Sequence, residues 1–263
     1  MKLSKEQKLF LRNYKLKKII IFLIQIGIIL AFLILWEILS NNKIINPFIF
    51  SSPSKVIETI KNLYLSNNLF LHIWVTIYET LIAFLIGTSI SILISILLYL
   101  YNGLYKVLDP FLTCLNSLPK VALGPMIIIV AGASTKSIIV MAILINVIVS
   151  TIVITNGFYG TDGMRIKLLK TFNASKYQIL KYLVIPSSYK TIISSFKLGI
   201  SMSMIGVITG EFLVSKAGLG YLIIYGTQVF NLNLVISGIV LLIIISYILF
   251  KLVEYIEKLL VKN

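Results

Sequence analysis

The chain has 263 residues, of which 58% are hydrophobic and 13% are charged, and its mean hydropathy is +0.99. This apolar share lies well above that of an ordinary soluble domain. The apolar residues come in blocks of about 20, the length that crosses a hydrocarbon layer roughly 30 Å thick. The composition therefore predicts an integral membrane protein and excludes a soluble domain.

A formal net charge of +15 could favour nucleic acid as a partner. However, most lysines lie in short segments beside the apolar blocks, where positive charge sets the orientation of a membrane protein. No basic stripe with interleaved aromatic residues lies on a soluble segment. We therefore expect no nucleic-acid partner.

The sequence offers few residues for catalysis or metal binding. Cys114 is the single cysteine and His72 the single histidine, so neither a thiolate zinc cluster nor an internal disulfide can form. The chain also lacks the G-x-x-x-x-G-K-[ST] motif that holds nucleotide phosphates. We expect no enzyme activity, no metal site and no bound cofactor.

The first predicted element is a cytoplasmic segment, residues 1–18. It carries seven basic residues directly before the first apolar block, which places it inside by the positive-inside rule. The apolar block at 19–39 is too long for the core of a signal peptide, and no A-x-A-like cleavage site follows. It is predicted to remain as a membrane span.

Six spans are predicted in an all-α polytopic fold. The third is irregular, because the stretch 108–132 contains Pro110, Pro119 and Pro125, each of which lacks a backbone donor. We expect a bent or interrupted helix there, with its regular part near 121–132, and a short outer helix at 54–65. The predicted spans are 19–39, 73–100, 121–132, 137–156, 191–214 and 232–250.

The basic residues agree with six crossings and with both termini in the cytoplasm. Under this arrangement 18 lysine and arginine residues lie inside and five outside, while Lys197 falls within the fifth span. The domain organisation that follows is a cytoplasmic segment at 1–18, a six-span transmembrane domain at 19–250 and a cytoplasmic tail at 251–263.

The longest internal cytoplasmic loop, 158–190, is predicted to fold as two short helices. Thr161 or Asp162 can cap the first helix, which presents Leu169 and Phe172 on one face. Asn173 is expected to end it, because asparagine tolerates the left-handed conformation found at helix C-termini.

The second helix of this loop has its own start signal. Ser175 followed by Gln178 forms a capping box, and the apolar residues Ile179 to Val184 recur at spacings of three and four. Pro186 suits the first turn of the span that follows.

Five stretches in order resemble the permeases of ATP-binding-cassette (ABC) importers, in the nitrate/taurine/sulfonate branch. The resemblance covers about residues 30–250 and includes the cytoplasmic "EAA" loop, written EAA---G---------I-LP. The matching stretches are SSPSKVIETI (51–60), LHIWVTIYET (71–80), SLPKVALGPMIIIVAGASTKS (117–137), NASKYQILKYLVIP (173–186) and GEFLVSKAGLGYLI (210–223).

The chain departs from the family pattern at a few positions. The Glu-Ala-Ala positions fall on residues 167–169, Lys-Leu-Leu, and the family glycine falls on Asn173. Any salt bridge made by the family's acidic residue is therefore in doubt. Glu79 stands where many relatives carry arginine.

The resemblance implies a type I importer permease fold in which the 158–190 loop is a coupling helix that docks in a groove of a separate ATPase subunit. It further implies a second permease copy, an external solute-binding protein that is periplasmic or lipid-anchored, and ATP use by the partner alone. Sulfonates, nitrate-like anions and vitamin precursors are the solutes it suggests. The docking loop would comprise Leu169, Phe172, Asn173, Ala174, Ser175, Tyr177 and Pro186.

Three residues are candidates for the translocation path or its gate. Glu211 lies in an apolar span, where a carboxylate is costly unless it is neutralised, interfacial or facing a cavity. A structural group bonded near the SKAGLG segment is the alternative. Pro119 and Pro125 could provide a bend that lets the pore walls move, or simply a packed kink.

The remaining motifs have mainly structural interpretations. His72 and Thr76 share one helical face near a span end, and AGLGY (217–221) is expected to form a turn or re-entrant segment. An autonomous secondary transporter or channel is the alternative function. Such a protein usually has several intramembrane charges or an internal repeat, and neither is visible.

Overall fold

The computed structural model describes residues 5–261, and these form α-helices, two irregular helical turns and connecting loops, without a strand. The all-α prediction is confirmed for this part of the chain. Besides a 3₁₀ turn at Lys120–Leu123 and a π-helical turn at Leu180–Val184, the helices are α1 (Lys5–Asn41), α2 (Pro47–Phe50), α3 (Pro53–Leu65), α4 (Leu69–Leu100), α5 (Asn102–Ser117), α6 (Gly124–Ala131), α7 (Thr135–Tyr159), α8 (Gly163–Thr171), α9 (Lys176–Ile179), α10 (Ile185–Val214), α11 (Leu219–Gln228) and α12 (Leu232–Val261).

Five helical segments of the described chain are long and apolar enough to cross a membrane. They match five of the six predicted spans. The segments are Leu16–Asn41, Leu69–Leu100, Thr135–Tyr159, Lys176–Gln228 and Leu232–Leu260.

The predicted third span is interrupted, as expected, and α6 lies within its predicted regular part at 121–132. The longer helix is α5, which precedes the expected 121–132 segment and tolerates Pro110 in its interior. The chain becomes extended at Leu118, as expected for a residue before proline, so Pro119 marks the break. Pro125 lies in the first turn of the eight-residue α6, where its missing N–H costs little.

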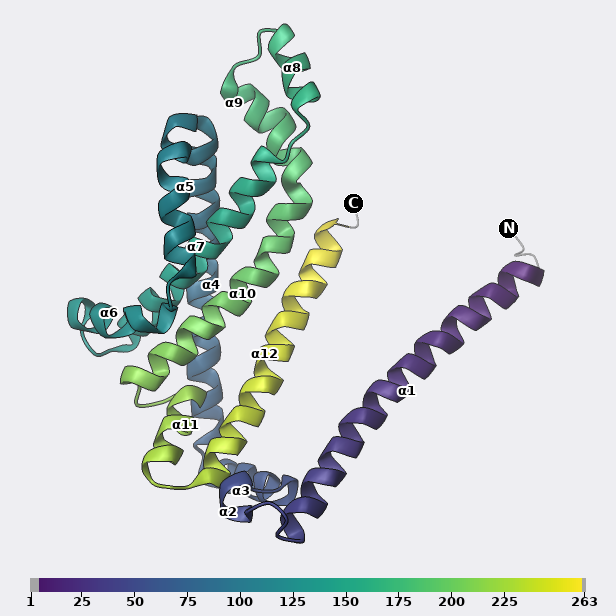
Figure 1. Ribbon diagram of the computed structural model, residues 1–263, viewed down its shortest axis with the longest axis vertical. Helices are drawn as coiled ribbons and strands as arrows, with labels where there is room; N and C mark the ends of the chain where they lie inside the picture. Colours follow the sequence, from purple (N-terminus) through teal and green to yellow (C-terminus); the bar gives the residue numbers. More distant parts are fainter. Residues whose placement is uncertain (1–4, 262–263) are drawn as a thin grey trace.

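The core of the bundle is built from α4, α7 and α10. Helix α7 packs against both others, and α11 and α12 complete the side that contains the largest apolar cluster. In Figure 1, α5 runs back alongside α4, and α8 and α9 project from one end of the bundle. The other end carries α2, α3 and α11.

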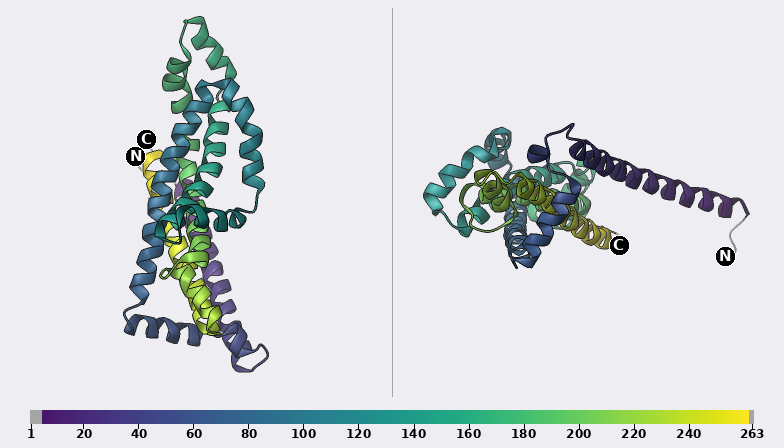
Figure 2. Two further views of the ribbon diagram at one scale, coloured as in Figure 1. Left: turned by 90° about the vertical axis from the view of Figure 1, so that its left-hand side faces the viewer. Right: turned by 90° about the horizontal axis from the view of Figure 1, so that it is seen from below.

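Helix α1 stands apart from this bundle (Figures 1 and 2). None of its most apolar window is buried. It is attached at its C-terminal end, where Trp36 Nε1 donates to the Phe50 carbonyl at 3.1 Å and Glu37 Oε2 accepts from the Ser54 N–H at 3.0 Å. The arrangement leaves the apolar surface of α1 open to lipid or to another protein.

The terminal helices continue across the predicted domain boundaries, which stay a prediction. Helix α1 begins at Lys5 without a break at residue 18, and α12 continues through the predicted tail to Val261. Residues 1–4 and 262–263 of these two segments lie outside the described residues. The fifth span also begins early, because α9, the π-helical turn and α10 follow one another without a gap from Lys176 to Val214.

Candidate functional site

The segment 161–186, called the elbow from here on, forms the tip of the molecule beyond the α4–α5 hairpin (Figure 1). Its first helix, α8, begins as predicted at Asp162, whose Oδ1 accepts the Met164 N–H at 2.9 Å. An acceptor at this position satisfies one of the free N–H groups of the first turn. The predicted cap is confirmed.

Asn173 makes the turn between the two helices of the elbow. Its φ of 57° lies in the left-handed region, as the sequence predicts. The Asn173 N–H donates to the Lys170 carbonyl at 3.0 Å, and the Ala174 N–H donates to the Leu169 carbonyl at 3.1 Å. This pair of bonds is a Schellman motif, which satisfies the last carbonyl groups of a helix. The direction of the turn is therefore fixed by the backbone.

The second helix of the elbow begins with the predicted capping box. Ser175 Oγ accepts the Gln178 N–H at 3.3 Å, and Gln178 Oε1 accepts the Ser175 N–H at 2.7 Å. Pro186 lies in the first turn of α10. No break separates α9 from α10. The second helix of the elbow is therefore the beginning of one continuous helical segment that runs to Val214.

The inner face of the elbow is packed on the bundle. Ile179, Leu180 and Val184 are fully or almost fully buried against Ile154 and Phe158 of α7. Leu169 and Ala174 are half-buried against the same cluster. The elbow is thus packed against α7, which precedes it in the chain. Leu169 lies partly within this packing.

The outer face of the elbow carries an exposed apolar strip. Met164, Leu168 and Phe172 are 79%, 57% and 74% exposed, and their spacing of four places them on one face of α8. Tyr177 is also exposed. Phe172 and Tyr177 were predicted from the sequence, whereas Met164 and Leu168 were not, although the i, i+4, i+8 spacing with Phe172 could have revealed them.

A second group of polar residues is buried at the start of α11. Thr76 Oγ1 donates to Glu211 Oε1 at 2.6 Å and accepts the Leu219 N–H at 2.8 Å. Glu211 Oε2 accepts the Gly220 N–H at 2.5 Å, and His72 Nδ1 accepts the Gly218 N–H at 3.0 Å. Side chains of α4 and α10 therefore satisfy the N-terminal N–H groups of α11, which attract a carboxylate.

Two glycines allow this close approach. Gly218 has a φ of +117°, which other residues rarely adopt, and a Cβ there would collide with the Glu211 carboxylate. A Cβ on Gly220 would lie 2.8 Å from Glu211 Oε2. The AGLGY segment is thus the turn that receives Glu211, as its structural interpretation predicts, and it continues into a helix.

Glu79 is buried close to this group but is not bonded to it. Its side chain is fully enclosed, and neither carboxyl oxygen has a hydrogen-bond partner within the described structure. Glu211 and the Thr135 side chain are the polar groups near enough to influence it. Glu79 is the position at which the sequence departs from the arginine of many relatives.

Comparison with known sequences identifies the class of protein. The family described as "Binding-protein-dependent transport system inner membrane component" matches residues 91–262, well over half of the chain. The chain belongs to this permease family. The resemblance expected from the ordered motifs is confirmed, and the alternative of an autonomous transporter or channel is set aside.

Several relatives support the assignment of this permease. It is 25% identical over 231 residues to a putative aliphatic sulfonates transport permease protein, SsuC, of Bacillus subtilis, covering 87% of this chain and 83% of that protein. It is 24% identical over 193 residues to the formylaminopyrimidine transport permease protein ThiX of Halalkalibacterium halodurans, covering 73% and 76%.

A solved structure shows the fold of the permease. A chain of the MetNI methionine ABC transporter in an inward-facing conformation superposes with a TM-score of 0.61 at 18% identity. The match covers 73% of the permease and 93% of that chain. The protein therefore has the all-helical fold of an ABC importer permease, with several spans in the inner membrane.

Membership of this family indicates which steps of transport belong to the permease and which to its partners. It is the membrane subunit of an ABC importer and not itself an enzyme, since ATP is hydrolysed by a partner ATPase. A binding-protein-dependent system also includes a solute-binding protein. The permease must therefore present one surface to an ATPase and another to a binding protein.

The predicted path residues occupy two different settings in the permease. Glu211 is 1% exposed, so in this conformation its carboxylate is closed off from any solute. Pro119 and Pro125 flank the irregular connection between α5 and α6, and both are exposed. A role for these three residues in the path or gate stays a prediction.

Proposed function

We propose that the permease crosses the membrane six times in the type I arrangement, with α5 and α6 together forming the third crossing. At the elbow end, Tyr159 Oη donates to Asn102 Oδ1 at 3.1 Å. At the other end, Gly124 at the start of α6 lies against Leu213 near the end of α10. Together, α5 and α6 thus extend from the elbow end of the bundle to the level of the last turn of α10.

In this arrangement the elbow and both termini are cytoplasmic. The support is the asymmetry of basic residues, which favours the side with the N-terminal lysines and the elbow. The bundle end with α2, α3 and α11 then faces the binding protein.

The elbow is proposed to dock in a groove of the ATPase subunit. The observation that carries this proposal is the exposed strip of Met164, Leu168 and Phe172 on a helix with a fixed turn and a packed inner face. An apolar helix face bordered by basic residues is suited to a hydrophobic groove. Asn173, Ala174 and Ser175 set the direction of the helix, whereas Phe172 and Tyr177 would contact the partner.

The pathway is proposed to be completed by a second copy of the permease. Irregular backbone at membrane depth must be covered by protein or line a water-filled cavity, and the connection between α5 and α6 is uncovered in the single chain. Ile129 and Val130 of α6 are also more than 80% exposed. A homodimer would enclose this face.

The proposed solute is a small organic anion, such as a sulfonate or nitrate-like anion, or a vitamin precursor. Support comes from the names of the relatives, which transport sulfonates and formylaminopyrimidine. The bound ligand of the partner binding protein, identified by mass spectrometry after co-purification, is the direct test.

Docking of the elbow can be tested with Phe172→Asp. A charge placed in the apolar strip should prevent burial of that strip in the ATPase groove. We expect the variant to insert in the membrane at normal levels but to lose co-purification with the ATPase subunit and solute uptake by cells.

The matched control is Phe230→Asp. Phe230 is 75% exposed, almost the same as Phe172, but it lies between α11 and α12 at the opposite end of the molecule. This variant should keep the ATPase subunit. Equal retention of the ATPase by both variants would show that the elbow is not the docking site.

A further inference from the structure

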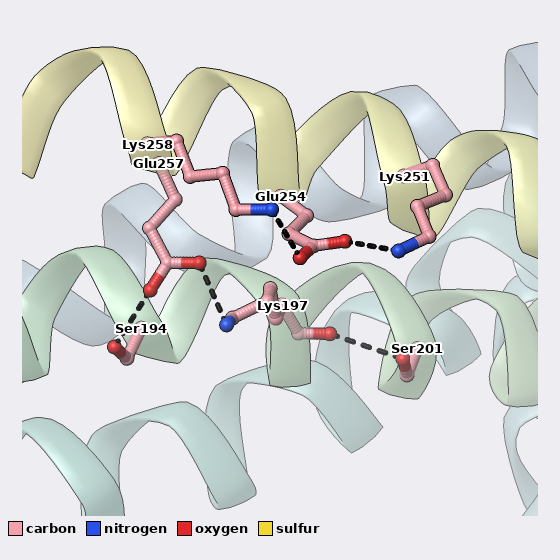
Figure 3. Close-up of polar contacts among 7 residues, drawn as sticks. All are labelled: Ser194, Lys197, Ser201, Lys251, Glu254, Glu257 and Lys258. Carbon is pink, nitrogen blue, oxygen red and sulfur yellow. Dashed lines mark hydrogen bonds and ion pairs between the residues drawn. The ribbon is translucent and has the colours of Figure 1, made fainter. Parts of the chain in front are cut away.

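Lys197 of α10 has a specific partner on α12. Its Nζ lies 2.7 Å from Glu257 Oε2, and Glu257 Oε1 accepts the Ser194 hydroxyl at 3.0 Å (Figure 3). Both charged side chains are mostly buried, with 30% and 14% exposure. Glu257 is therefore held by two residues of α10 that are one turn apart.

Two further contacts show how α10 and α12 are aligned. Tyr189 Oη donates to the Leu260 carbonyl at 3.4 Å, and Ser246 Oγ lies 3.5 Å from Met204 Sδ. The helices are antiparallel, and the first turns of α10 lie beside the last turns of α12. Lys197 is thus level with Glu257 of the predicted cytoplasmic tail, which supplies its opposite charge.

Glu257 differs from the other charged residues on the same part of α12. Glu254 pairs with Lys251 at 2.6 Å and with Lys258 at 2.7 Å, and all three belong to α12 (Figure 3). These pairs cannot hold α12 to a neighbouring helix. Among the ion pairs of the described residues, Lys197–Glu257 alone joins two helices of the bundle.

Apolar side chains also pack next to this pair. Ile200, Met204 and Leu249 are buried in the largest apolar cluster, and a groove of about 220 Å³ lies beside them between α10 and α12. Inside a membrane, apolar contact alone gives little preference for one helix register, because lipid chains are equally apolar. The ion pair and its serine bond therefore add a directional contact to the apolar packing of α12 on α10.

Helix α10 also leads directly to the elbow. Lys197 lies 11 residues beyond Pro186 on a continuous rod, a distance of about 16 Å at 1.5 Å per residue. A displacement of the elbow therefore reaches Lys197 through helical backbone.

We propose that Lys197 and Glu257 are a positioning pair that transmits movement of the elbow from α10 to α12. This inference depends on the proposed docking of the elbow with the ATPase. It assigns a coupling role to the end of α12, which would otherwise be a passive tail.

The test uses the complete importer with its ATPase subunits and binding protein. In a Cys114→Ser background, spin labels at Leu97→Cys and Leu252→Cys report the distance from α4 to α12, and labels at Leu97→Cys and Lys170→Cys report the elbow. Excess unlabelled permease ensures one labelled chain per complex. Distances are measured without nucleotide and after trapping with ATP and vanadate.

In labelled permease that keeps Lys197 and Glu257, we expect both distances to change on trapping. Glu257→Gln should abolish the change at α12 while the elbow still moves. Glu254→Gln, the matched control, should leave both changes intact. The charge-swapped variant Lys197→Glu/Glu257→Lys should restore the α12 change, which a merely destabilised protein would not do.

The outcomes separate the two proposals. If the ATPase does not co-purify, or if the elbow does not move in permease that keeps Lys197 and Glu257, the docking proposal is wrong. The present inference, which depends on it, is then wrong as well. If the elbow moves and α12 moves equally in Glu257→Gln, the inference alone is overturned. Failure of the charge swap to restore movement would also overturn it.

Discussion

At the scale of single residues, Glu211 and Glu79 are both enclosed carboxyl groups in very different surroundings. Glu211 accepts hydrogen bonds from Thr76 and Gly220 and lies at the N-terminus of α11, where the helix dipole favours negative charge. Glu79 has no hydrogen bond within the described structure. The first residue therefore stabilises the fold, whereas the second is a cost to it.

We expect Glu211→Gln to destabilise the permease. The amide has only one acceptor oxygen in place of two, so either the Thr76 hydroxyl or the Gly220 N–H loses its acceptor. The cost of such a buried unpaired group is about 1–3 kcal/mol. Unfolding of purified permease in a detergent titration measures it, and an unchanged midpoint would refute the structural role.

Glu79→Met should have the opposite effect. It removes two unpartnered oxygens while roughly keeping the volume of the side chain, so stability should rise by about 1 kcal/mol. The same titration provides the comparison with Glu211→Gln. A loss of stability in purified permease would contradict the cost assigned to the Glu79 carboxyl group.

These residue contacts were hard to predict from the sequence. The apolar setting of Glu211 marked it as unusual, and its alternative as a bonded group near SKAGLG matches the contact with Gly220. However, Thr76 is 135 residues away, and Lys197 and Glu257 are 60 apart. Pairs at such separations depend on how helices pack, which a single sequence does not specify.

At the scale of elements, the elbow was the most predictable part of the molecule. Asp162, Asn173 and the Ser175–Gln178 pair act on backbone groups within three residues, so their signals are local. Helix α5 was not predicted, because Pro110 suggested a break in the chain. In the structure the helix continues through Pro110 from Asn102 to Ser117.

Asn173 offers a test of the elbow as an element. Asn173→Gly should preserve the turn, because glycine adopts a positive φ freely. Asn173→Val should cost about 1–2 kcal/mol, the penalty of the left-handed conformation for an ordinary residue. Amide hydrogen exchange across residues 165–180 should be faster in the valine variant only. Equal exchange in both variants would show that the turn does not depend on residue 173.

At the scale of the whole molecule, the proposed orientation rests on the distribution of charge, whereas the placement of α1 could not be predicted in this way. Basic residues gather at the elbow end, and this signal could be read directly from the sequence. Nothing in the apolar run of α1 indicated that it would stand apart from the bundle, since its composition resembles that of a packed span.

Single-cysteine labelling tests the orientation of the whole chain. Cys114 is replaced by serine, and cysteine is placed at position 172 in the elbow or position 230 at the opposite end, in cells that lack the ATPase subunit proposed to cover position 172. A membrane-impermeant maleimide should label position 230 in intact cells and position 172 only after the cells are opened. The reverse pattern would contradict the proposed topology.

The attachment of α1 also bears on the order of biogenesis. Its hydrogen bonds to the following segment lie at one end, at Trp36, Glu37 and Ser40, and its apolar window is not buried in the bundle. An early, fully lipid-solvated first helix can act as an anchor during synthesis and find its final neighbour afterwards. In that order of events, folding of each subunit would precede the meeting of subunits, and a defect in one step would leave the other intact.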